Sequence, residues 1–391
     1  MSARGYVRLV FTLCAALLLP AAALNLALSI NSLRADKNRL ASEWQQATRG
    51  VTYAPPITHN RPFKTLRLND RIAEINTVVL GSSTTMGLAA DAFPPPLAAY
   101  NFAQSGNSLR AVVGEAEDIA GRWGIRVSLL VVPLDWSLGF VYEQGAPLRV
   151  ELTPDAVERG AAAARPSLAT QLADALSAPR LKILARILRD LARAPDAGAA
   201  FREVFLEPAG PEYRCADGTP ARDFDVLYRG MCNGFRHDGS ATFADQKPLD
   251  DSRARTALAA AVASGGEYAA MLRKSRGELN PVVLERLVRL ARRLEAGGGQ
   301  LLLLLPPLMP GMEEALAGTA HGGAPLRATK EALAAWSRRE RLALLDAGRS
   351  ERFGCVAAEF IDPHHALPAC YRKVFSRHFG DHPLTVSAAA R

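Results

Sequence analysis

The sequence lacks the patterns by which proteins usually hold nucleic acids or structural metal ions. It has no zinc-finger spacing, no helix-turn-helix pattern, no aromatic-plus-basic RNA-binding motif, no CxxC pair and no evident internal repeat. Its 47 Lys and Arg residues, against 39 Asp and Glu residues, give a formal net charge of +8, but the basic residues are scattered rather than grouped. A nucleic-acid partner is therefore not expected, whereas affinity for an anionic surface or glycan stays open.

The bulk composition is that of a globular protein. Of the 391 residues, 49% are hydrophobic and 22% are charged, which excludes an intrinsically disordered chain. The length suits one large domain with insertions or two domains.

The N-terminal segment contains a long apolar run. It extends from Leu9 to about Ile30 and is interrupted by Pro20, Asn25 and a few small polar residues, with Arg4 and Arg8 before it. About 20 apolar residues span a bilayer, whereas a signal-peptide core has about 7 to 15. We expect an uncleaved signal anchor over residues 1–33, with the remainder outside the cytoplasm. A cleaved signal peptide, using the small residues 21–23, is the first alternative, and a buried soluble helix is the second.

The cysteines agree with an oxidising compartment. Cys14 lies in the expected anchor, and an even number, four, lies beyond it. Four cysteines allow three connectivities. Proximity along the chain favours Cys215 with Cys232 and Cys355 with Cys370.

The remainder of the chain alternates between strand and helix patterns. A charged stalk and a Pro-rich linker are expected over residues 34–70, and an α/β domain over 71–391, with an Ala-, Leu- and Arg-rich helical insertion at about 151–280. Alternating strands and helices predict a mostly parallel sheet that is covered on both faces. Sites in such sheets lie at the carboxyl ends of the strands.

Two short motifs carry residues suited to nucleophilic catalysis. "TVVLGSSTTMGL", residues 77–88, places two serines and two threonines where a buried strand ends on Gly81, and "FIDPHHALPACYRK" places Asp362 three residues before His365. Each motif also has an ordinary interpretation, because hydroxyls cap helices and DxxH is common in polar loops. A serine nucleophile, however, needs an imidazole base that a carboxylate orients.

The order of these motifs resembles the SGNH (GDSL-type) hydrolase superfamily. More narrowly, it is similar to membrane-anchored SGNH-like proteins of bacterial cell envelopes, some of which work in O-acylation of exported polysaccharides. The resemblance covers roughly residues 75–145 and 285–380 and omits the insertion. It implies a flavodoxin-like three-layer sandwich for 71–391, and a single-pass inner-membrane protein with its soluble domain in the periplasm.

The resemblance also implies roles for individual residues. The GDS block falls on Gly81, Ser82 and Ser83, which makes Ser83 the nucleophile. Gly106, in "QSGNS", carries the Gly of the second block, and its backbone N–H would form an oxyanion hole with that of Ser83. The last block falls on Asp362 and His365, with His365 as general base.

The third family block departs from the pattern. Asp135, in "PLDW", stands near the position of the usual oxyanion-hole Asn. Asn107 is a candidate replacement donor, and Asp135 could instead cap a turn or bind a substrate hydroxyl. Trp136 could line a sugar subsite or simply pack. His364 with His378, Asp381 and His382 matches no standard zinc spacing, so no metal is expected.

Two functions from different classes follow. The first is a serine esterase or O-acyltransferase that acts on an envelope carbohydrate or acyl-ester substrate. It needs no cofactor, and a membrane acyl-transfer protein could supply its acyl donor. The second is an inactive, anchored SGNH-like protein that binds glycan or scaffolds an envelope or secretion complex; Asp135 favours this alternative.

Overall fold

The structure of the protein is a computed structural model. It describes residues 2–34, 37–53, 60–124, 126–134, 148–156, 167–207, 209–224, 230–244, 246–263, 268, 280–320 and 323–382. The chain forms two compact units, the first from Met1–Pro56 and Glu158–Cys232, the second from Ile57–Val157 and Asn233–Arg391. The candidate residues Asp135 and Trp136 lie outside the described residues.

A five-stranded parallel sheet forms the centre of the second unit. Its strand order is β3-β2-β4-β7-β8, and every neighbouring pair is parallel. The strands are β2 (Thr77–Val79), β3 (Ala99–Asn101), β4 (Leu129–Pro133), β7 (Gln300–Leu305) and β8 (Ala343–Asp346). β4 and most of β7 are buried along their length, as their continuous Leu and Val runs predict for strands covered on both faces. The expected α/β class with a mostly parallel sheet is confirmed.

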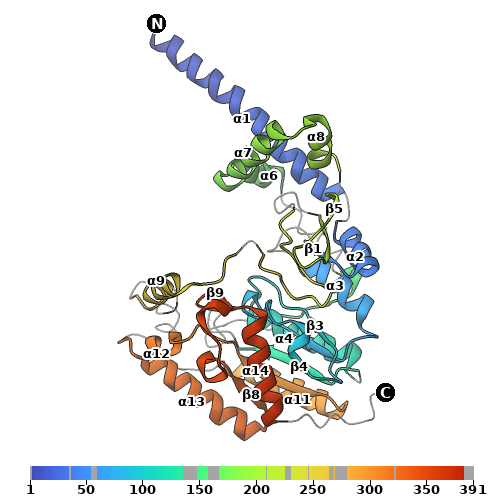
Figure 1. The fold of residues 1–391 in the computed structure, drawn as a ribbon, viewed down its shortest axis with the longest axis vertical. Helices are drawn as coiled ribbons and strands as arrows, with labels where there is room; N and C mark the ends of the chain where they lie inside the picture. The colour runs from blue at the N-terminus through green and yellow to red at the C-terminus, as the bar shows by residue number, and fades with distance from the viewer. Residues whose placement is uncertain are drawn as a thin grey trace. The chain divides into compact units, whose positions relative to one another are not determined.

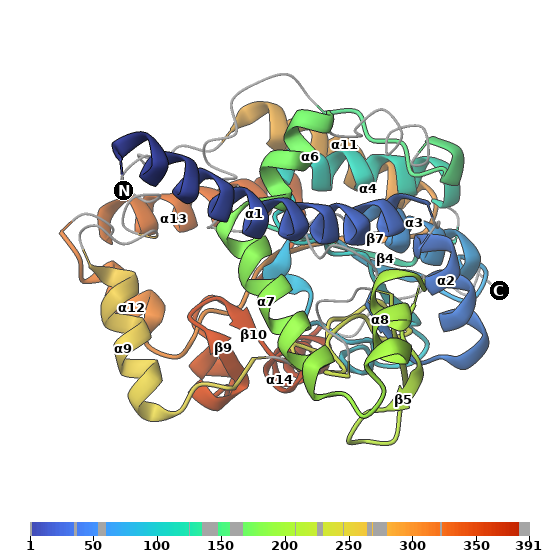
Figure 2. The ribbon, with the colours of Figure 1, turned by 90° about the horizontal axis from the view of Figure 1, so that it is seen from above.

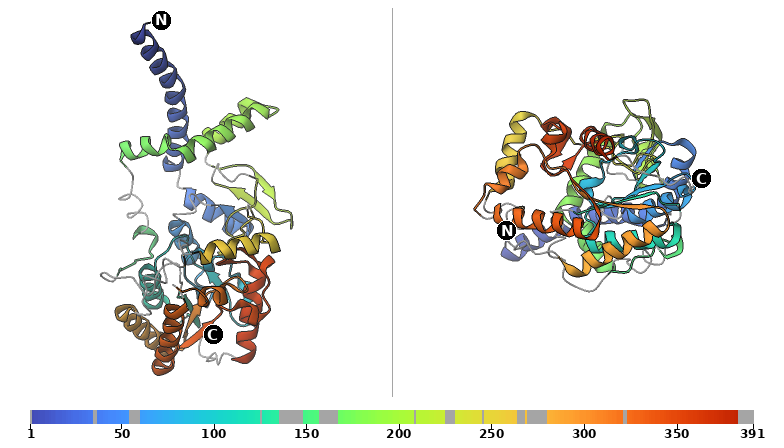
Figure 3. Two further views of the ribbon diagram at one scale, coloured as in Figure 1. Left: turned by 90° about the vertical axis from the view of Figure 1, so that its left-hand side faces the viewer. Right: turned by 90° about the horizontal axis from the view of Figure 1, so that it is seen from below.

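Helices lie on both faces of this sheet. α4 (Leu109–Trp123), α11 (Pro281–Ala296) and α13 (Gly323–Glu340) lie on one side, and α14 (Pro368–Asp381) lies on the other (Figures 2 and 3). The remaining elements of this unit are α3 (Arg61–Arg71), the 3₁₀ turns η2 (Ser83–Thr85), η3 (Ala90–Ala92), η5 (Ser350–Phe353) and η6 (Ala357–Glu359), α9 (Asp251–Val262), α12 (Met312–Ala317) and the antiparallel pair β9 (Phe360–Asp362) and β10 (His365–Ala366).

The first unit contains the N-terminal helix and part of the expected insertion (Figure 1). Its elements are α1 (Ala3–Arg34), α2 (Lys37–Thr48), β1 (Val51–Tyr53), α6 (Leu168–Ala175), α7 (Ala178–Arg193), α8 (Ala197–Phe205), β5 (Glu212–Arg214) and β6 (Pro220–Asp223). α1 contains a stretch, Ala3–Ala27, that is long and apolar enough to cross a membrane. β1, β6 and β5 form a small sheet in that order.

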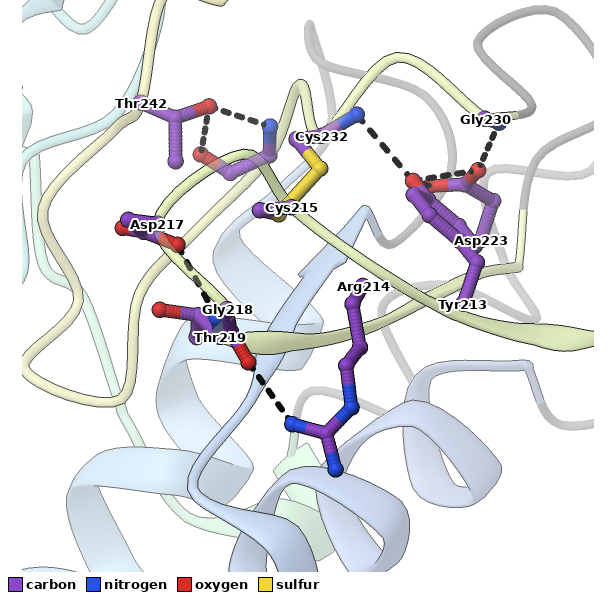
Figure 4. Close-up of a disulfide and its surroundings, with 11 residues drawn as sticks. Tyr213, Arg214, Cys215, Asp217, Gly218, Thr219, Asp223, Gly230, Cys232 and Thr242 are labelled. Carbon is purple, nitrogen blue, oxygen red and sulfur yellow. Dashed lines mark hydrogen bonds between the residues drawn. A yellow bond between two sulfur atoms is a disulfide. The ribbon is translucent and has the colours of Figure 1, made fainter.

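Both disulfides favoured by the sequence are confirmed. Cys215 pairs with Cys232 in the first unit, and Cys355 pairs with Cys370 in the second, with Cα separations of 5.6 and 5.1 Å. Around the first bond, the carboxylate of Asp223 accepts hydrogen bonds from the Tyr213 hydroxyl and the N–H of Gly230 (Figure 4). The two bonds therefore stabilise one unit each.

The domain organisation differs in detail from the division expected at residues 34, 71 and 151–280. α3 lies in the stretch expected as linker, yet Phe63, Lys64 and Leu68 on it are fully buried in the second unit. The expected insertion also divides, because residues 158–232 join the N-terminal helix and α9 joins the sheet unit.

Candidate active site

The serine turn begins where β2 ends, at the carboxyl edge of the sheet. Gly81 has φ +132°, and a Cβ there would collide with Thr85 and with the ring of Pro133, so only glycine fits the position. Ser83 then opens the 3₁₀ turn η2. A single such turn, rather than a regular helix, follows the strand.

The hydroxyls of this turn have different partners. Ser82 is buried and its side chain accepts the backbone N–H of Thr84, as expected of a capping residue. Thr85 donates to the carbonyl oxygen of Leu80 at 3.1 Å. Ser83 alone points out of the turn, and its Oγ lies 2.8 Å from Nε2 of His365. The predicted approach of Ser83 to His365 is confirmed.

Asp362 and His365 are held by the β9–β10 hairpin. They face each other in its register, with Pro363 and His364 in the turn between them. Nδ1 of His365 lies 2.6 Å from Oδ2 of Asp362, and the backbone N–H groups of His364 and His365 both donate to Oδ1 at 2.9 Å. The carboxylate is thus fixed by the backbone and in turn fixes the ring.

The protonation state of Asp362 suits this position. Burial raises the pKa of Asp362, but the hydrogen bond from His365 and the nearby His365 and His364 charges outweigh it and lower this pKa to about 2. The carboxylate is therefore ionised at neutral pH, where it can stabilise an imidazolium on His365.

Gly106 lies on a loop beside the serine turn. Its φ of +66° is left-handed, and it is solvent-exposed. The loop is fastened to Gly81, whose carbonyl oxygen accepts the N–H of Gln104 at 3.0 Å. Within the described residues, neither the N–H of Ser83 nor that of Gly106 donates to a protein acceptor. Both N–H groups therefore remain available to a ligand.

Asn107 has other partners. Its Nδ2 donates to Glu115 at 2.9 Å and to the carbonyl oxygen of Gly81 at 3.4 Å, and its Oδ1 accepts from Arg61 at 3.1 Å. Both amide hydrogens thus have protein acceptors in this geometry. The side chain fastens the Gly106 loop to the end of β2, which differs from the donor role considered from the sequence.

A buried carboxylate beneath the loop was missed by the sequence analysis. Glu115 on α4 is fully buried, and it accepts from Arg61, Gln104 and Asn107. Burial raises the pKa of Glu115 to about 7, although Arg61 and the amides oppose that rise. A signal existed in the sequence, because Glu115 stands between Val112 and Ile119 on the apolar face of its helix.

α3 supplies a second buried charge. Nζ of Lys64 donates to the carbonyl oxygens of Asn101, Ala103 and Gly239 at 2.6 to 3.0 Å. Burial lowers the pKa of Lys64 to about 7, opposed by Asp238 and Glu115. Asn101 in turn donates to the carbonyl oxygens of Thr85 and Leu88, so this lysine braces the strand end that supports the serine turn.

Two groups of potential metal ligands occur among the described residues. One contains Cys355 and Cys370, whose sulfurs are bonded to each other. The other is Asp362, His364 and His365, in which both ring nitrogens of His365 already contact Asp362 and Ser83. His378 and His382 lie together at the end of α14, and no described group joins them with His364.

Comparison of the chain with protein-family profiles, curated proteins and solved structures finds no match.

Proposed function

We propose that this protein is a serine-dependent esterase or O-acyltransferase that works through an acyl-serine intermediate. The observation that carries the proposal is the continuous hydrogen-bonded relay from Ser83 through His365 to Asp362. A serine hydroxyl is barely ionised at neutral pH, and a base in contact with it removes that obstacle. Ordinary packing of polar side chains would not need an imidazole placed between an outward-pointing serine and an ionised carboxylate.

Each residue of the candidate site has a separate role in the proposed reaction. His365 takes the Ser83 proton as Oγ attacks the ester carbonyl, and Asp362 stabilises the resulting imidazolium. The N–H groups of Ser83 and Gly106 receive the oxyanion. Collapse breaks the ester C–O bond, and His365 gives its proton to the departing alcohol. Water or a sugar hydroxyl then attacks the acyl-Ser83, loses its proton to His365 and restores the free serine.

The fold supports placement in the SGNH superfamily. Numbered from its first strand, the sheet has the order 2-1-3-4-5, which is the flavodoxin-like order. Ser83 follows the first of these strands, and Gly106 follows the second. Asp362 and His365 follow the last strand. We infer that the unit is a flavodoxin-like three-layer sandwich of the SGNH type.

Substrate and location follow from the same proposal. An apolar helix long enough to span a bilayer supports membrane anchorage, and two disulfides support an oxidising compartment. With the SGNH resemblance, we propose a bacterial inner-membrane protein whose soluble part lies in the periplasm. The natural substrate class there is an envelope or exported carbohydrate carrying acyl esters. A membrane acyl-transfer protein would be the donor if the enzyme transfers rather than hydrolyses.

A fluorophosphonate probe on the full chain in detergent tests the proposal. The wild-type protein should label, and peptide mapping should find the adduct on Ser83. Ser83→Ala should abolish labelling, whereas Ser82→Ala should keep most of it while losing about 1 kcal/mol of stability with its cap. A folded wild-type protein that does not label, or equal labelling of Ser83→Ala, would overturn the proposal; the first result would favour the non-catalytic, glycan-binding alternative.

A further inference from the structure

α7 carries a cationic stripe on one face. Lys182, Arg186, Arg189 and Arg193 recur at spacings of four, three and four residues, so they share one side of the helix, and all four are exposed. Asp190 is the only acidic residue of α7. The residues of the candidate active site all belong to the other unit.

The opposite face of α7 packs on α1. Leu184 and Ile187 form an apolar cluster with Phe205 of α8, against which Ala21, Leu24 and Ala27 of α1 pack. A polar contact fixes the same place, because buried Asn25 of α1 donates 2.8 Å to the carbonyl oxygen of Ala175 at the end of α6. This bond gives a partner to the amide N–H of the polar residue that interrupts the apolar run.

The contact between α7 and α1 sets how far along α1, and so how deep in a membrane, α7 would lie. Ala21, Leu24 and Ala27 are at the far end of the apolar stretch Ala3–Ala27. At about 1.5 Å per residue they lie within about 9 Å of that end. α6 and α7 cross α1 at a steep angle, as Figures 2 and 3 both show. If α1 runs across a bilayer, α7 lies along its surface, near the headgroups.

The exposed apolar residues of α7, α8 and the α6 region agree with a position near the headgroups. Leu188 on α7 is 42% exposed, and it lies on the flank between the buried face and the cationic stripe. Phe201 on α8 is 40% exposed, and Leu206, the residue after the end of α8, is 63% exposed. Leu172 and Leu176 of the α6 region are also exposed. Interfacial helices place such side chains among acyl chains while Lys and Arg reach the phosphates.

We propose that α6, α7 and α8 form an interfacial membrane-binding surface, whose cationic stripe binds anionic phospholipid headgroups. Charge complementarity and continuity with the membrane-crossing part of α1 select a lipid surface as the occupant. The protein would then be attached at two places, by a crossing helix and by helices lying in the headgroup region. The inference depends on the orientation of α1 and is independent of the proposed chemistry.

The test places an NBD fluorophore on the full chain in vesicles. Single labels are attached at Leu188→Cys, at Phe11→Cys within α1, and at Val282→Cys, which is exposed on α11. Each is made in a Cys14→Ser background, because Cys14 is the free cysteine of the described chain. The vesicles contain phosphatidylglycerol and phosphatidylcholine in a ratio of about 3:7, with or without acyl-chain bromination.

Brominated lipid should quench the Leu188 and Phe11 labels at least twofold and leave the Val282 label unchanged. Replacing Lys182, Arg186, Arg189 and Arg193 by Gln should reduce quenching at Leu188 severalfold, as should vesicles of phosphatidylcholine alone, without changing the Phe11 signal. A water-exposed Leu188 label beside a quenched Phe11 label would overturn the inference. So would quenching at Leu188 that is independent of both lipid charge and the four substitutions, since apolar contact alone would then hold this face at the membrane.

Discussion

The hydroxyl of Tyr371 donates a hydrogen bond of 2.6 Å to the carbonyl oxygen of Thr84, although the two residues are 287 positions apart. Tyr371 is fully buried on α14, and Thr84 follows the candidate nucleophile directly. The bond fastens the last helix to the turn that presents Ser83.

Tyr371→Phe should therefore weaken this attachment. It removes one buried hydrogen bond, which costs about 0.5 to 1.5 kcal/mol. Urea unfolding should show that loss, and fluorophosphonate labelling should slow severalfold. Tyr6→Phe, on the exposed face of α1, is the matched control and should change neither quantity.

Asp362→Asn should impair the chemistry far more than the fold. An amide cannot stabilise the imidazolium on His365 and favours the wrong tautomer, a change that costs on the order of 10³ to 10⁴-fold in serine hydrolases. Labelling rates at neutral pH give the comparison directly. A variant that labels at more than a tenth of the wild-type rate would show that Asp362 is dispensable.

The same carboxylate predicts an acid-sensitive contribution to stability. Its pKa in the folded protein, about 2, is below the ordinary value of 3.8, so the folded state favours the ionised form. The contribution is fully present above about pH 4 and is lost as the pH falls through 2. The stability difference between wild type and Asp362→Asn should shrink over that interval, as urea titrations at several pH values can measure.

Glu115→Gln should test whether Glu115 acts by holding the Gly106 loop in position rather than by taking part in the reaction. Burial raises the pKa of Glu115 from 4.5 to about 7, so the folded state binds more protons than the unfolded state between these values. Glu115 therefore makes wild-type stability fall as the pH rises from about 4.5 to 7, and the Gln variant should lack this component. Because Glu115 holds Gln104 and Asn107 on either side of Gly106, labelling should also slow severalfold at neutral pH. An unchanged pH dependence of both stability and labelling would contradict the assignment.

Loss of the Cys355–Cys370 bond should affect the candidate site selectively. The cysteines are 15 residues apart and enclose Asp362 and His365, and closing a loop of this size is worth about 3 kcal/mol. The double Ser variant should lose labelling at a lower urea concentration than wild type. The double Ser variant of Cys215 and Cys232, which removes the bond in the other unit, should lose labelling at the wild-type concentration.

Membrane topology can be checked independently of the site. An alkaline phosphatase reporter fused after residue 50 should be active, because α1 would carry it out of the cytoplasm with Arg4 and Arg8 remaining inside. The same fusion with a cytoplasmic fluorescent reporter should stay dark. The opposite pair of results would contradict the proposed orientation.

The sequence predicted those parts of the site that depend on local patterns. A buried strand that ends on Gly81 determines where Ser83 is exposed, and a DxxH hairpin determines that Asp362 and His365 face each other. Glu115 was missed because its importance depends on Arg61, which lies 54 residues away in a segment with the composition of a linker.

The division into units was equally hard to predict. β1 pairs in parallel with β6, from Val51 with Ala221 to Tyr53 with Asp223. Strands of three or four residues carry almost no periodic signal, and pairing across 170 residues leaves none in the local sequence. The helices of residues 168–205 were recognisable, but their association with α1 depends on packing that only the folded chain displays.

The separation of 282 residues between Ser83 and His365 also bears on when the protein becomes reactive. If the chain is exported as proposed, a chain threaded outward from its N-terminus presents the serine early in translocation and the histidine hairpin much later. Throughout that interval the proposed nucleophile would have no base and would be inert. Under the proposed function and orientation, reactivity would therefore be confined to chains whose export is nearly finished.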